Sequence, residues 1–117
     1  MPRKVGKAMK PAETQETIAE MVRRIVQVAR PTRIILFGSA ARGQMGPHSD
    51  VDLLVVVPDG MHRRRTAQLI HRSLLGIGVA KDVIVVTESD VREHGDNPSL
   101  IIFPAIREGK ELYHATG

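Results

Sequence analysis

The sequence predicts an α/β fold, because short apolar runs alternate with segments of helical periodicity. The runs Ile34–Phe37 and Val51–Val57 are rich in β-branched residues and too short for independent helices, so each predicts a buried strand. Residues 82–86 predict a third strand, and residues 110–114 predict an edge strand. Strands separated by helical segments indicate a sheet packed with helices.

Two amphipathic helices are predicted in the first two thirds of the chain. The first runs from about Ala12 and ends before Pro31, since the residue before a proline is disfavoured in the helical region. Its apolar residues follow the spacing of one buried stripe: Ile18, Met21, Val22, Ile25, Val28 and Ala29. We expect Asp59 to cap a second helix that continues to about Leu75 and ends at two glycines.

The last third of the chain contains capping and stop signals. Ser89 can cap a short helical turn whose acidic residues suit a helix N-terminus. Asn97 followed by Pro98 is a helix start signal, and we expect this helix to reach Glu108. Pro104 should kink or split it, because proline removes a backbone donor and clashes with the preceding turn.

Length and composition indicate one small domain. We expect the 117 residues to form a basic N-terminal arm (1–10) and a single domain (11–117). The absence of cysteine excludes disulfides and cysteine zinc sites. The sequence shows neither a membrane-spanning apolar stretch nor a secretory signal, so we expect a cytoplasmic location without membrane contact.

The charge of the chain favours an anionic ligand or partner. The formal net charge is +4, and a basic surface associates with nucleotides, nucleic acids or acidic proteins. The three aromatic residues, Phe37, Phe103 and Tyr113, are too few for a base-stacking platform, so we do not expect direct nucleic-acid binding. The run His62–Arg65 is either a solvated helix face or a contact for an acidic partner, a phosphate or RNA.

The polar turn between the first two strands carries the candidate site. Gly38 follows the first strand, where the backbone turns sharply or approaches a ligand, and Ser39 offers a hydroxyl and an amide to an anion. Asp50 and Asp52 open the second strand two positions apart, so both carboxylates project from one face. Adjacent carboxylates repel each other, and a divalent cation, Mg²⁺ above all, is the natural reason for placing them together.

Each part of this pattern also has a simpler interpretation. A single D-x-D is usually a solvated strand start, and Gly-Ser is usually a turn. Asp82, at the mouth of the third strand, could cap a loop or bind solvent, and Arg42 is as often an exposed arginine as a phosphate contact. The joint pattern of strand, Gly-Ser, ten residues, D-x-D and strand is far more specific.

This joint pattern, within LFGSAARG and SDVD, resembles the minimal nucleotidyltransferases of the DNA polymerase β-like superfamily. The resemblance spans roughly residues 18–113, is strongest over 36–57, and includes the similar ending REGKELY. It implies a single nucleotidyltransferase domain with a mixed β-sheet packed with helices. It also implies metal-dependent transfer of AMP from ATP to an acceptor hydroxyl.

The resemblance further implies roles for individual residues. The glycine and serine would hold the β- and γ-phosphates, while the acidic residues would coordinate two Mg²⁺ ions. Two roles stay open for the third acidic residue: it is a metal ligand only, or it is a metal ligand and also the general base. The expected catalytic and metal-binding residues are Asp50, Asp52 and Asp82, and the expected nucleotide-binding residues are Gly38, Ser39 and Arg42.

Single-domain members of this family are commonly paired with a helical HEPN ribonuclease toxin and act as its antitoxin by adenylylating it on tyrosine. The resemblance therefore implies a HEPN-family partner in a hetero-oligomer. Two alternatives stay open. One is an antitoxin that neutralises the HEPN protein by contact alone, and the other is an RNA-binding protein that uses His62–Arg65 and the N-terminal arm.

Overall fold

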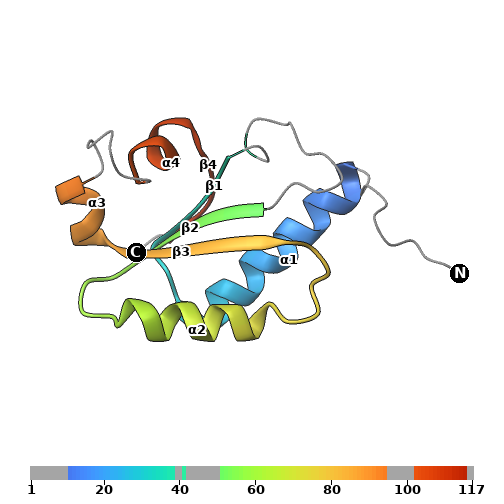
Figure 1. Ribbon diagram of the computed structural model, residues 1–117, viewed down its shortest axis with the longest axis horizontal. Helices are drawn as coiled ribbons and strands as arrows, with labels where there is room; N and C mark the ends of the chain where they lie inside the picture. Colours follow the sequence, from blue (N-terminus) through green and yellow to red (C-terminus); the bar gives the residue numbers. More distant parts are fainter. Residues whose placement is uncertain (1–10, 39–40, 42–50, 95–101, 116–117) are drawn as a thin grey trace, which may run out of the picture.

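The computed structural model describes residues 11–38, 41, 51–94 and 102–115, which form a four-stranded sheet between two pairs of helices (Figure 1). The strand order is β3-β2-β1-β4. β2 and β3 are parallel, whereas β1 is antiparallel to both β2 and β4, so the predicted mixed sheet is confirmed. The elements are α1 (Pro11–Ala29), β1 (Arg33–Phe37), β2 (Val51–Val57), α2 (Arg63–Ser73), β3 (Lys81–Thr87), α3 (Glu88–His94), α4 (Ile102–Glu108) and β4 (Lys110–His114).

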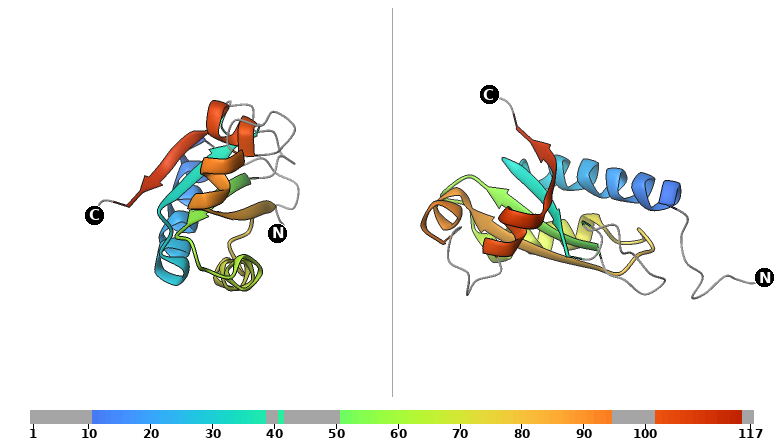
Figure 2. Two further views of the ribbon diagram at one scale, coloured as in Figure 1. Left: turned by 90° about the vertical axis from the view of Figure 1, so that its left-hand side faces the viewer. Right: turned by 90° about the horizontal axis from the view of Figure 1, so that it is seen from above.

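The central strand β2 is buried on both faces, as its apolar run predicts. Leu53 and Val55 pack in a core with residues of α1 and α2. Leu54 and Val56 pack in a second core with residues of α3 and α4 on the other face. Figure 2 shows the two helix pairs on opposite faces of the sheet. Each fully buried Val or Leu side chain contributes about 1.5–3 kcal/mol, so β2 fixes the position of both helix layers.

Helix α1 confirms the predicted amphipathic stripe except at Val28, which is 40% exposed. Met21, Ile25 and Ala29 are buried on the side that faces the sheet. The helix ends at Ala29 because Arg30 adopts a left-handed φ of 46° immediately before Pro31.

The predicted cap of α2 is wrong. The helix begins later than expected, and His62 is its N-cap, since its Nδ1 accepts the backbone N–H of Arg65 at 3.2 Å. Asp59 instead accepts the backbone N–H and the hydroxyl of Ser89 at 2.8 and 2.7 Å. The turn after β2 therefore directs this carboxylate toward α3, which lies far away in sequence.

The predicted cap of α3 is also wrong, because Thr87 rather than Ser89 caps this helix. The backbone N–H of Asp90 donates to Thr87 Oγ1 at 3.2 Å, and the backbone N–H of Thr87 donates to the Asp90 carboxylate at 2.9 Å. This reciprocal pair is a capping box, which satisfies two backbone donors at once.

Helix α4 is continuous from Ile102 to Glu108, so Pro104 does not split it within the described residues. Pro104 is its third residue, and a proline in the first turn removes no intrahelical hydrogen bond. Gly109 ends the helix as predicted, with its N–H donating to Ala105 O at 3.0 Å. The start signal at residues 97–98 and the arm 1–10 lie outside the described residues, so the division into arm and domain stays a prediction.

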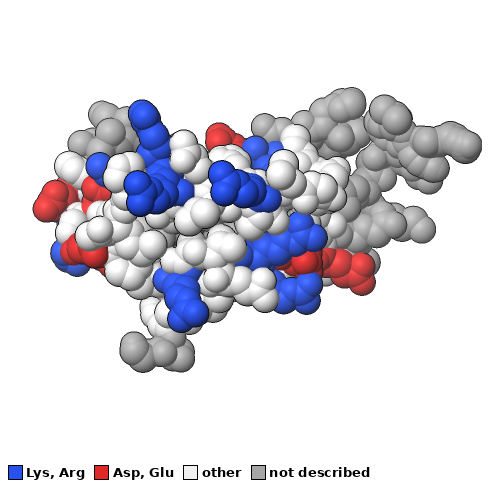
Figure 3. Space-filling view, turned by 90° about the horizontal axis from the view of Figure 1, so that it is seen from below, with Lys and Arg blue, Asp and Glu red and all other residues white. Residues whose placement is uncertain are grey.

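The surface of α1 and α2 carries many cationic side chains. Seen from below, Lys and Arg spread across the middle of this face, while acidic side chains lie mostly toward its ends (Figure 3). A search of the described helices for a segment long and apolar enough to cross a bilayer finds none.

Candidate active site

Asp52 and Asp82 are direct neighbours across the parallel strand pair β2–β3. Residues in register on adjacent parallel strands project to the same face, and the strands lie about 4.8 Å apart. Both carboxylates share the sheet face of Leu54, Val56 and Ile84, which is the face that packs with α3 and α4. Asp52 is half-buried and Asp82 is exposed, so one carboxylate is anchored in the sheet and the other is open to solvent.

Gly38 brings the end of β1 against the Asp52 carboxylate. Phe37 pairs with Asp52 across the antiparallel strands, and Gly38 follows with a left-handed φ of 75°. A Cβ atom at this position would lie 2.4 Å from Asp52 Oδ2, closer than real atoms approach. Only glycine fits both the backbone conformation and the space beside the carboxylate. The chain then turns, with the Ala41 N–H donating to Gly38 O at 3.2 Å.

Gly38, Asp52 and Asp82 lie together at one end of the sheet. β2 and β3 both start at its right-hand end in Figure 1, whereas α3 follows β3 at the left-hand end. The predicted site residues Ser39, Arg42 and Asp50 lie outside the described residues. The structure thus brings together Gly38, Asp52 and Asp82, and the catalytic roles of all six residues stay predictions.

The residues present fit a divalent cation. Two in-register carboxylates on one face repel each other in the absence of a counter-charge. Mg²⁺ is commonly bound through one or two carboxylates together with substrate phosphates and water. No group of three acidic or histidine side chains suited to a metal occurs in the described ranges, which do not include Asp50.

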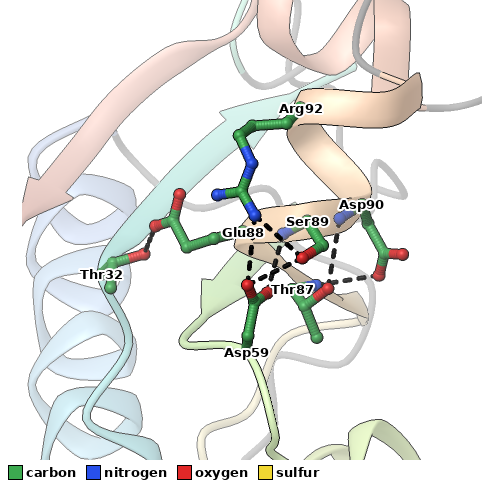
Figure 4. Close-up of polar contacts among 7 residues, drawn as sticks. All are labelled: Thr32, Asp59, Thr87, Glu88, Ser89, Asp90 and Arg92. Carbon is green, nitrogen blue, oxygen red and sulfur yellow. Dashed lines mark hydrogen bonds and ion pairs between the residues drawn. The ribbon is translucent and has the colours of Figure 1, made fainter.

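A second group of carboxylates lies at the opposite end of the same two strands (Figure 4). Hydrogen bonds from Ser89, and then the nearby Arg92 guanidinium at 3.2 Å, hold the pKa of Asp59 below its ordinary value. The hydrogen bond from the backbone N–H of Thr87 lowers the pKa of Asp90 in the same way. The Asp90 carboxylate also forms an ion pair with the Arg63 guanidinium at 2.9 Å. These carboxylates are satisfied by protein donors, so they join α3 to the sheet and need no cation.

Comparison with known proteins decides the family. The family model of the nucleotidyltransferase domain matches residues 16–108, which covers most of the chain. The chain belongs to the nucleotidyltransferase domain family. This confirms the family resemblance that rests on the Gly-Ser and D-x-D spacing.

One curated relative is similar over half of this nucleotidyltransferase domain. The bifunctional uridylyltransferase/uridylyl-removing enzyme of Burkholderia thailandensis is 41% identical over 59 residues, which are 50% of this chain. The match spans only 6% of the length of that enzyme. It is therefore a relative of the domain rather than of the whole protein.

Solved structures confirm the fold. A Sulfolobus solfataricus protein described as a nucleotidyltransferase aligns with a TM-score of 0.56 at 19% identity, over 95% of this chain and 93% of that one. A toxin–antitoxin with AMP-PNP aligns with a TM-score of 0.59 at 18% identity, over 83% of this chain and 73% of that one. A mutant of the toxin–antitoxin MntA-HpeT aligns with a TM-score of 0.57 at 16% identity, over 89% and 74%. At these identities the likeness concerns the fold alone.

Proposed function

We propose that this nucleotidyltransferase domain transfers AMP from ATP to a tyrosine hydroxyl of a HEPN-family toxin, and thereby acts as its antitoxin in the cytoplasm. The observation that carries the proposal is the in-register pair Asp52 and Asp82 beside Gly38, in a chain of the nucleotidyltransferase domain family. The carboxylates supply the metal ligands, and the glycine supplies space for a phosphate beside them.

The metal ligands in this proposal are Asp52, Asp82 and Asp50. When bound to them, Mg²⁺ offsets the charge of the triphosphate and lowers the pKa of the acceptor hydroxyl. The two in-register carboxylates provide oxygen ligands on one face of the sheet, which suits an ion shared with substrate phosphates.

The chain itself positions the reactants. Gly38, which lacks a Cβ beside Asp52, lets phosphate oxygens approach the carboxylates, and the Ser39 amide and Arg42 contact the β- and γ-phosphates. The acceptor oxygen forms a bond to the α-phosphorus, and the bond from this phosphorus to the bridging oxygen breaks. Pyrophosphate leaves with the electron pair of the broken bond. The hydroxyl proton passes to the Asp82 carboxylate, and because this carboxylate is exposed, solvent can then take the proton from it.

The comparisons support the choice of nucleotide and partner. One similar structure is described as a toxin–antitoxin with AMP-PNP, an ATP analogue. The MntA-HpeT mutant carries two aspartate-to-glutamate substitutions two positions apart, which is the spacing of Asp50 and Asp52. The uridylyltransferase relative makes UTP the competing nucleotide to test.

The deciding experiment incubates the protein with Mg²⁺, each of the four ribonucleoside triphosphates, and a HEPN-family protein from the same organism. We expect ATP to add one AMP to the partner, detected by mass spectrometry, and the site to map to a tyrosine. The Asp52→Asn variant should lose this addition by roughly 10³-fold, as expected when groups that stabilise transition-state charge are removed. A partner of unchanged mass with all four nucleotides would contradict the proposal.

Thermal melts test the same site without a partner. ATP together with Mg²⁺ should raise the melting temperature clearly, whereas ATP alone should raise it only weakly, because stabilisation follows binding to the native state. Equal shifts with and without Mg²⁺ would indicate nonspecific attraction to the basic surface. Toxin neutralisation that needs no nucleotide and survives Asp52→Asn would instead favour an antitoxin that acts by contact.

A further inference from the structure

Helix α2 and its flanking turns form a basic segment without acidic residues. Residues 60–80 contain four arginines and no Asp or Glu. Arg63 pairs with Asp90 at 2.9 Å. The other three side chains, Arg64, Arg65 and Arg72, are exposed, and none makes a hydrogen bond or ion pair with the rest of the described chain.

Helix stability explains Arg72, whose charge in the last turn of α2 favours the helix dipole, but it does not explain Arg64 and Arg65. The first turn of α2 contains no acidic residue, and positive charge there opposes the helix dipole. Arg64 and Arg65 therefore lower the stability of α2 in the isolated protein. Their charge becomes favourable only when an anionic group lies against the helix.

Two exposed leucines lie near these arginines along the chain. The exposed large apolar side chains of the described residues are Val28 on α1 (40% exposed), Leu69 on α2 (41%) and Leu75 just after it (72%). Leu69 follows Arg65 by four positions and precedes Arg72 by three, so these side chains share one face of the helix. Leu75 continues the same row three positions after Arg72. We call Arg65, Leu69, Arg72 and Leu75 the α2 stripe.

The end of the α2 stripe is held in place by α1. The guanidinium of Arg24 bonds Glu20 at 2.8 Å and donates to the backbone oxygens of Ser73 and Leu75 at 3.2 and 3.3 Å. These bonds fix the turn that carries Leu75. A surface that is already ordered loses less conformational entropy when a partner binds.

We propose that the α2 stripe is the docking surface for an acidic protein surface with an apolar centre, presented by the toxin of the proposed function. Uncompensated arginines beside exposed leucines fit a protein interface, because the buried centre of such an interface is apolar and arginine is enriched in it. A nucleic acid would use the arginines alone, because leucine offers nothing to a phosphate and the aromatic residues used for base stacking are few.

The docking surface and the candidate active site lie on opposite faces of the sheet. α2 packs on the face of Leu53 and Val55, whereas Asp52 and Asp82 project from the face of Leu54 and Val56. Docking and nucleotidyl transfer therefore use separate residues. Variants of one surface should leave the other intact, although the docking proposal relies on the proposed function for the partner.

The test uses the same HEPN-family protein and measures its affinity for the parent and for four variants by titration calorimetry. Arg65→Glu, Arg72→Gln and Leu69→Ser should each weaken binding by roughly tenfold or more. Lys110→Glu, which makes the same charge change as Arg65→Glu on the exposed edge strand β4, should stay within about twofold. Arg65→Glu places an acid in the first turn, where it favours the helix, so unfolding would not explain its effect.

The outcomes separate the two proposals. If the parent does not bind this protein, or if Arg65→Glu and Leu69→Ser bind it as tightly as the parent, the docking proposal is overturned. Binding of a single-stranded RNA that is lost in Arg65→Glu and kept in Leu69→Ser would overturn it in favour of nucleic acid. If the stripe variants lose binding but the docked partner never receives AMP from the parent, docking holds and the proposed transfer fails.

Discussion

Carboxylates lie at both ends of the parallel strands β2 and β3, and their surroundings differ between the two ends. At the end where the strands finish, Asp59 and Asp90 receive hydrogen bonds from Ser89 and Thr87 and ion pairs from arginines. At the end where they start, Asp52 and Asp82 face the same side in register, and the missing Cβ of Gly38 leaves room for the Asp52 carboxylate.

The difference teaches which carboxylates hold the fold together and which serve a ligand. A carboxylate surrounded by protein donors stabilises the native state, and removing it leaves those donors unpaired. Two carboxylates placed in register repel each other, and a cation bound between them removes this repulsion. Substitutions at the end with Asp59 should therefore lower the stability of the protein, whereas substitutions at the end with Asp82 should lower its activity.

The largest effect is expected at Gly38. In Gly38→Ala the new methyl group would collide with Asp52 Oδ2, so the carboxylate must leave its position beside Gly38. We expect AMP transfer to fall by roughly 10²-fold or more, since small misplacements in active sites have effects of this size. The measurement is the initial rate of partner labelling with Mg²⁺ and ATP.

Gly76→Ala is the matched control for this substitution. Gly76 has a similar φ of 82°, but a Cβ there meets nothing within 4 Å. It should lose about 1–2 kcal/mol of unfolding free energy from backbone strain and keep its transfer rate. Equal activity losses in the two variants would show that strain, rather than the contact with Asp52, explains the effect of Gly38→Ala.

A smaller effect is expected at the cap of α3. Thr87→Ala removes the side-chain oxygen that accepts the Asp90 N–H, which should lower the unfolding free energy by about 1 kcal/mol in urea titrations. Transfer should stay at the parental rate, because this cap lies at the far end of β3. Thr17→Ala on α1, where the hydroxyl makes no bond within the described residues, should show no such loss.

The smallest effect is expected in acid. Hydrogen bonds from Ser89 lower the pKa of Asp59 in the native state below its ordinary value of 3.8. The stability that it contributes is therefore fully present above that value and is lost as pH falls through the native pKa. Unfolding free energy measured from about pH 5 to about pH 2 should fall less steeply in Asp59→Asn than in the parent. Identical slopes would mean that this carboxylate does not hold α3 in solution.

Local patterns were sufficient to predict the strands and α1. The run Val51–Val57 can only be a buried strand, and the spacing of Met21, Ile25 and Ala29 defines one helical face. The acids at the mouths of β2 and β3 were visible as well. Their pairing in register depends on the parallel pairing of β2 and β3, which local patterns alone could not supply.

The wrong predictions have two causes: a contact between distant segments at Asp59, and local signals that were misread at the cap of α3 and at Pro104. Asp59 stands where a helix cap would stand, but its partner Ser89 comes from a different element, and no local spacing reveals that pair. The capping box of Thr87 and Asp90 was readable, because T-x-x-D before a helix is a local signal. Gly109 was predicted only as a stop, whereas a Cβ there would lie 2.5 Å from Ile35 Cγ2, so the glycine also permits close packing on β1.

The most direct test of the account compares Asp82→Asn with Asp59→Asn, one substitution at each end of the strands. For each variant, the unfolding free energy without ligand and the rate of AMP transfer are measured under the same conditions. We predict that Asp82→Asn keeps or gains stability and loses transfer by at least about 10²-fold, whereas Asp59→Asn loses stability and keeps transfer. A marked loss of stability in Asp82→Asn, or transfer near the parental rate, would contradict the assignment of Asp52 and Asp82 as a metal site.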